Sequence, residues 1–121
     1  MGKIGTKLGA LLVKHGVPTD SASACYSQVG DGWLPLIEDL IIELKKLDWN
    51  LDVHQIKEKF GGLRFYTGDT TSEMDDLIRK AEAASFKICE DCSKPGKATT
   101  PRGWIRTLCV ACDEKRNATP N

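Results

Sequence analysis

The chain has 121 residues, a length that fits one domain. It also fits a small core with a still smaller second unit that needs a cross-link to be stable. Its 17 basic and 17 acidic side chains cancel, which disfavours a strongly basic nucleic-acid binder and an acidic disordered tail. The composition is that of an ordinary soluble globular chain, and no apolar run approaches the length of a membrane helix. Five cysteines are its unusual feature.

The N-terminal region lacks the pattern of a secretion signal. The apolar run over residues 8–13 is short, and no convincing small-residue cleavage site follows it. An odd number of cysteines without such a signal favours a reducing compartment, where thiols stay free or bind metal. We therefore expect a cytoplasmic protein that does not enter a membrane.

Two helices are predicted in the first half of the chain. Apolar side chains at spacings of three and four predict one over residues 4–15. Residues 19–32 lack a sustained period and predict a loop in which Cys25 packs as a small buried hydrophobe. A longer apolar stripe predicts the second helix over residues 33–47, with Pro35 in the first turn, where a missing amide donor costs little.

A β-hairpin is predicted next. Gly61-Gly62 would form its two-residue loop, because glycine readily adopts the positive φ of such turns. This register places Lys59 opposite Arg64. One face would then pack on the core and consists of Ile56, Phe60, Leu63 and Phe65. The other would face solvent or a ligand and consists of Lys57, Lys59, Arg64 and Tyr66.

A third helix is predicted over residues 72–88. Thr70 and Glu73 have the spacing of a capping box, and apolar residues then recur at helical intervals. This helix leads directly into the first pair of cysteines.

Four of the cysteines have the spacing of a metal site. Cys89-x-x-Cys92 and Cys109-x-x-Cys112 are separated by sixteen residues, enough for a returning hairpin, and can supply four thiolates to one tetrahedral ion. Because a catalytic zinc keeps an open position, this set predicts a closed, structural Zn²⁺ site. A redox dithiol pair, an iron–sulfur site and unligated thiols are the alternatives.

The order of elements around these cysteines resembles a treble-clef zinc finger. Pro95-Gly96 supplies a turn, residues 103–107 a strand, and a terminal helix can begin at Cys112. The predicted fold class is α+β, with helices and a hairpin in a core of residues 1–86. A four-cysteine zinc finger of residues 87–121 packs on this core.

The finger has too few apolar residues to fold without metal; they are mainly Trp104, Ile105, Leu108 and Val110. We expect Trp33 to anchor the start of the second helix and Trp104 to anchor the finger hairpin. A partner-facing hot spot is the alternative reading of both rings.

The sequence carries no constellation typical of catalysis. It contains no Gly-rich phosphate loop, no Ser-His-Asp set and no carboxylate pair in a recognisable motif, so we expect a protein that is not an enzyme. Its candidate partner or nucleic-acid contacts are basic residues with one ring among them, although an ordinary charged strand face would look similar. These candidates are Lys57, Lys59, Arg64, Tyr66, Arg102 and Arg106.

Two resemblances bear on function. The predicted helix that runs into Cys89-Glu90-Asp91-Cys92, followed by Cys109-Val110-Ala111-Cys112, resembles the end of DksA/TraR-type regulators of RNA polymerase. A Gly-Gly hairpin stands here in place of the long helical hairpin of that family. The resemblance therefore makes polymerase binding a secondary expectation.

The fuller pattern resembles small uncharacterised proteins of bacteriophages and prophages. It consists of Gly32-Trp33, the hairpin sequence KEKFGGLRFY over residues 57–66, and the finger with Gly103-Trp104. The resemblance implies a setting in which small accessory proteins bind and divert host machinery. We therefore expect a non-enzymatic, zinc-binding accessory protein that binds a host protein or protein complex, with inhibition of a host defence system as one use. A nucleic-acid-binding or RNA-polymerase-binding transcriptional regulator is the alternative.

Overall fold

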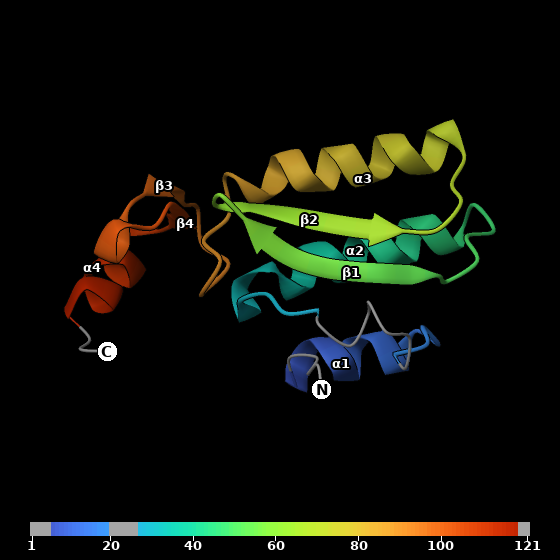
Figure 1. The fold of residues 1–121 in the computed structure, drawn as a ribbon, viewed down its shortest axis with the longest axis horizontal. Coiled ribbons are helices and arrows are strands. Elements are labelled where there is room, and N and C mark those ends of the chain that lie inside the picture. Colours follow the sequence, from blue (N-terminus) through green and yellow to red (C-terminus); the bar gives the residue numbers. More distant parts are fainter. Residues whose placement is uncertain (1–5, 20–26, 119–121) are drawn as a thin grey trace.

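The structure, a computed structural model, describes residues 6–19 and 27–118. The predicted packing of Cys25 lies outside these residues. The predicted α+β class is confirmed, and Figure 1 shows the arrangement. In chain order the elements are α1 (Thr6–Lys14), η2 (Asp31–Trp33), α2 (Leu34–Lys45), β1 (Val53–Lys59), β2 (Gly62–Thr67), α3 (Ser72–Ser85), β3 (Lys97–Thr99), η3 (Pro101–Gly103), β4 (Arg106–Leu108) and α4 (Val110–Ala118).

The hydrophobic core lies between the β1–β2 hairpin and the first three α-helices. Trp33 is fully buried at the start of α2, as predicted, although the chain there forms the short 3₁₀ turn η2 before the α-helix begins. In Figure 1 the segment that contains β3, β4 and α4 lies beyond the turn of the β1–β2 hairpin. Within the described ranges, no helix combines the length and the hydrophobicity needed to cross a bilayer.

The hairpin forms, but its loop lies one residue earlier than predicted, so residues 55–59 of β1 each pair with a residue two positions away from the predicted one. The strands pair Lys59 with Gly62 and Lys57 with Arg64, so Phe60 and Gly61 make the loop, with φ of 53° and 85°. The predicted core residue Phe60 is consequently 68% exposed. Gly62 lies in the strand because a Cβ there would come within 2.2 Å of the Phe86 ring.

Side chains of α3 cover the outer edge of β2. The Leu63 N–H donates to Ser85 Oγ at 2.8 Å, and the Phe65 N–H donates to Glu82 Oε2 at 2.9 Å. An unpaired strand edge is a template for aggregation, and these bonds close it. A partner of the hairpin must therefore approach the face of the sheet and not this edge.

The third helix begins at Ser72 as predicted, but its N-cap residue and its C-terminal end differ from the prediction. Thr71, not Thr70, is the N-cap, and its side-chain oxygen accepts a hydrogen bond from the Met74 N–H at 3.3 Å. The helix ends at Ser85, three residues early, because the chain then turns so that Ile88 forms a β-bridge with Pro95. Beyond this turn Cys89 is buried, whereas Cys92 is exposed.

Candidate metal centre

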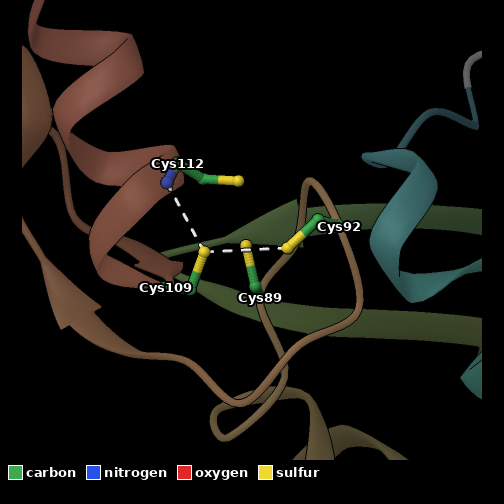
Figure 2. Close-up of side chains that lie close together, drawn as sticks. All are labelled: Cys89, Cys92, Cys109 and Cys112. Carbon is green, nitrogen blue, oxygen red and sulfur yellow. Dashed lines mark hydrogen bonds between the residues drawn. The ribbon is translucent and has the colours of Figure 1, made fainter.

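The four cysteines predicted to bind metal lie together, as Figure 2 shows. Their Sγ atoms all lie within 4.8 Å of one another, and Cys92 Sγ is 3.6 Å from Cys109 Sγ. Four sulfurs bound tetrahedrally at about 2.3 Å would lie about 3.8 Å apart, so the cluster has the size that one ion requires. Among the described residues, it is the one group of His, Cys, Asp and Glu side chains close enough to share an ion.

The second cysteine pair lies at the N-terminal end of α4, which begins at Val110, two residues earlier than predicted. The Cys112 backbone N–H donates to Cys109 Sγ at 3.4 Å, and this bond lowers the pKa of Cys109 to about 7. Burial raises the pKa of Cys112. A cation between the four sulfurs would favour the thiolate form of each cysteine.

The first cysteine pair is held against the start of α2 by backbone hydrogen bonds. The Gly32 N–H donates to the Glu90 carbonyl at 2.7 Å, and Ser93 Oγ donates to the Gly32 carbonyl at 2.7 Å. The buried Trp33 indole Nε1 donates to the Ile88 carbonyl at 2.9 Å. We call these three hydrogen bonds the knuckle clamp. It couples the geometry of the first cysteine pair to the hydrophobic core.

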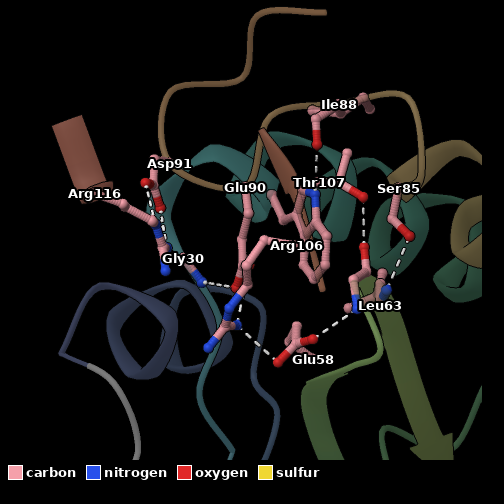
Figure 3. Close-up of polar contacts among 12 residues, drawn as sticks. Gly30, Glu58, Leu63, Ser85, Ile88, Glu90, Asp91, Arg106, Thr107 and Arg116 are labelled. Atoms are coloured by element: carbon pink, nitrogen blue, oxygen red, sulfur yellow. Dashed lines mark hydrogen bonds and ion pairs between the residues drawn. The ribbon is translucent and has the colours of Figure 1, made fainter. Parts of the chain in front are cut away.

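The buried carboxylate of Glu90, the residue that follows Cys89, makes polar contacts with two other segments (Figure 3). The Glu90 side chain is only 4% exposed; its Oε2 accepts from the Gly30 N–H at 3.1 Å, and Arg106 lies 3.4 Å from its Oε1. Burial raises the pKa of Glu90 despite these partners. Arg106 also binds Glu58 at 2.7 Å, so the predicted partner contact Arg106 is neutralised by two carboxylates.

Further contacts join the cysteine-bearing segment to the hairpin turn. Thr107 Oγ1 donates to the Gly61 carbonyl at 2.6 Å, and a Cβ on Gly61 would lie 3.1 Å from Ile105. Arg116 of α4 binds both oxygens of Asp91, at 2.8 and 2.6 Å, and this bond raises the pKa of Arg116. The finger therefore meets the hairpin at the turn between β1 and β2.

Four of the predicted partner contacts share one face of the hairpin, because paired residues in adjacent strands project to the same side. Lys57 pairs with Arg64, Tyr66 pairs with Gln55, and Lys59 pairs with Gly62. Each lysine lies near a ring, with Lys57 Nζ 5.7 Å from the Tyr66 centroid and Lys59 Nζ 5.7 Å from the Phe60 centroid. The sixth candidate, Arg102, lies in η3, and its side chain is outside the described structure.

The prediction that Trp104 anchors the finger is wrong. Its side chain is 75% exposed, and Ile105 and Val110 are also exposed, whereas Leu108 is fully buried. Trp104 and Ile105 lie with Phe60 around a hollow of about 190 Å³, whose lining is completed by the ion-paired Glu58 and Arg106. We call Phe60, Trp104 and Ile105 the aromatic patch. The patch arises because the hairpin turn and the finger expose large apolar side chains at the same place.

Both histidines pair with carboxylates. His15 Nε2 lies 2.8 Å from Glu38 Oε2, and His54 Nε2 lies 3.2 Å from Asp52 Oδ2. Phe86, which the sequence interpretation did not single out, covers Gly62 and is 45% exposed. The sequence feature that could have indicated the role of Phe86 is its position as a large apolar residue directly after the last buried residue of α3, Ser85.

This chain matches no protein-family model, and no similar curated protein or solved structure was found. The class of site therefore rests on geometry alone. The chain is an α+β protein with two β-hairpins and a four-cysteine cluster that could hold a metal ion.

Proposed function

We propose that the four cysteines hold one structural Zn²⁺ ion. All four ligands would be thiolates, a donor set typical of closed zinc sites, and the Cys112 N–H already supports Cys109 as an anion. The ion would cross-link residues that precede β3 to the first turn of α4. It would replace the apolar core that this segment lacks, since Trp104, Ile105 and Val110 are exposed.

We further propose that the chain is a non-enzymatic accessory protein of bacteriophage type that acts by binding a host protein complex, with inhibition of a defence system as one outcome. The bacteriophage setting comes from the sequence resemblance, and the aromatic patch is the observation that supports a protein partner. Large apolar side chains gathered around one hollow are typical of protein interfaces, where a few buried aromatic residues supply most of the binding energy.

The charges beside the patch favour a protein partner over a free polyanion at this place. Glu58 and Arg106 line the hollow but neutralise each other at 2.7 Å. A partner side chain that entered the hollow would therefore meet an apolar wall and a compensated ion pair. Burial of Trp104 alone would remove enough apolar surface to contribute about 2 kcal/mol or more.

Affinity capture from the host lysate tests this proposal. The tagged wild type should retain one host complex in a fixed ratio, and Trp104→Ala and Ile105→Ala should each lose it about tenfold or more. Ile42→Ala is the matched control, because Ile42 is exposed to a similar extent (39% against 46%) but lies on α2. Equal loss in the control, or full retention in both patch variants, would contradict the proposal.

The rival function, a nucleic-acid-binding or polymerase-binding regulator, is favoured by a different observation. That observation is the set of basic and aromatic side chains on the open face of the hairpin. A steep loss of nucleic-acid binding as the salt concentration rises would support this function.

A further inference from the structure

The open face of the β1–β2 hairpin carries cations and aromatic rings, and the cations form no ion pair with any residue that the structure describes. Among the described residues, Lys57, Lys59 and Arg64 share this face and none forms an ion pair. The Nε atom of Arg64 is buried and has no hydrogen-bond partner in the part of the chain that the structure describes. The nearest acidic residue in the strands, Glu58, projects to the opposite side, where Arg106 holds it. Within the described ranges, these three positive charges thus lack an ion-pair partner.

Exposed rings lie among these charges. Tyr66 is on the same face and is 42% exposed, Phe86 covers Gly62 on that face, and Phe60 follows at the turn. Each of the two lysines reaches toward one of these rings. From the Gln55–Tyr66 pair to the Lys59–Gly62 pair, the face extends about 13 Å along the strands.

We propose that this face binds single-stranded nucleic acid. Bases would stack on the exposed rings, and the three cations would contact phosphates, as occurs where a strand crosses a sheet that displays aromatic side chains. The length of the face suits about two or three nucleotides. A single strand fits better than a duplex because base-paired bases present no open ring face to Tyr66 or Phe86.

The binding surface is distinct from the aromatic patch in all but Phe60, which lies at the turn where the two meet. The inference deepens the rival function and does not rest on the proposed protein partner. Trp104 and Ile105 line the hollow, whereas Lys57, Arg64 and Tyr66 would contact the nucleic acid. A variant in one set should leave the other binding event intact.

Salt dependence of oligonucleotide binding tests the inference. The probe is fluorescently labelled oligothymidylate of about 12 nucleotides, read by polarisation, with a duplex of equal length for comparison. Three phosphate contacts predict a slope of log affinity against log salt of about −2, and Lys57→Ala with Lys59→Ala should reduce it to about −0.7. Tyr66→Leu keeps an apolar side chain, removes the ring and should weaken binding about tenfold.

The charge-matched control is Lys14→Ala with Lys46→Ala. These lysines lie on α1 and directly after α2, where each is paired with a glutamate. Single-strand binding that survives in this control and falls in the hairpin variants supports the inference. Absence of binding at about 20 mM salt, equal affinity for the duplex, equal loss in the control, or no effect of Tyr66→Leu would each overturn it. Circular dichroism of every variant checks that the fold persists.

Discussion

Gly32→Ala should break the knuckle clamp. A Cβ at Gly32 would lie 2.2 Å from the Cys89 carbonyl oxygen and 2.6 Å from the Glu90 carbonyl carbon. These are backbone atoms, which cannot move aside as a flexible side chain would. The substitution therefore forces the cysteine-bearing segment away from the start of α2.

The magnitude follows from the two hydrogen bonds that Gly32 makes, one through its N–H to Glu90 and one through its carbonyl from Ser93, both at 2.7 Å. Each contributes about 1 kcal/mol, and leaving the two backbone groups of Gly32 unpaired costs about 1 kcal/mol more in total. A loss of about 3 kcal/mol in the free energy of unfolding is expected. At an unfolding entropy of about 2.1 cal/mol/K per residue, this lowers Tm by about 12 °C for a chain of this length.

Differential scanning calorimetry of the metal-loaded protein measures this shift. Gly103→Asn is the control, because nothing lies within 4 Å of a Cβ there and asparagine tolerates its φ of +88°. We expect the control to lose about 1 kcal/mol or less. A Tm for Gly32→Ala within about 2 °C of the wild type would refute the idea that the clamp couples the cysteine cluster to the core.

Two further predictions concern metal removal and acid. Chelation should shift the NMR resonance of the Trp33 indole N–H, which donates to the Ile88 carbonyl next to the first cysteine. The resonance of the Trp49 indole N–H, which donates to the hairpin, should stay unchanged. Equal shifts of both resonances would argue against a local role for the metal. Hydrogen bonds from His15, which has the larger effect, and from Lys14 lower the pKa of Glu38 from its ordinary value of 4.5. Its carboxylate thus stabilises the fold above that pH. The Tm advantage of the wild type over Glu38→Gln should be present at about pH 6 and vanish as the pH falls through the folded pKa; a pH-independent difference would contradict this.

The helices and the cysteine cluster could be predicted from the sequence because both depend on local spacing. Apolar residues three and four apart placed α1 and α2 to within about two residues. Two Cys-x-x-Cys pairs predicted one ion site, since each pair brings its sulfurs together whatever the rest of the fold does.

The hairpin register depended on a contact that spacing does not reveal. Local preference favours Gly61-Gly62 as the two-residue turn, because phenylalanine rarely adopts a positive φ, yet Phe60 does so here at 53°. The Phe86 ring, which follows α3, occupies the place of a side chain at position 62 and requires that glycine in the strand. The shifted loop also made the prediction for Phe60 wrong, because it moved this residue from the predicted core into the aromatic patch.

The placement of Trp104 and Arg106 also depended on distant residues. An apolar ring in a small finger is reasonably expected inside, yet Thr107 and Leu108 are the buried residues of that strand. Arg106, a predicted partner contact, lies 2.7 Å from Glu58, which stands 48 residues earlier in the chain. Composition and periodicity do not predict pairs of residues that lie this far apart in the sequence.

Site-specific photo-crosslinking tests the central claim, that the aromatic patch binds a host protein, most directly. Benzoylphenylalanine replaces Trp104 in one variant and the similarly exposed Val13 of α1 in another, and both are irradiated in host cells. The account predicts one dominant protein adduct from position 104 that position 13 does not form. Identical adduct patterns at the two positions, or no protein adduct at position 104, would contradict it.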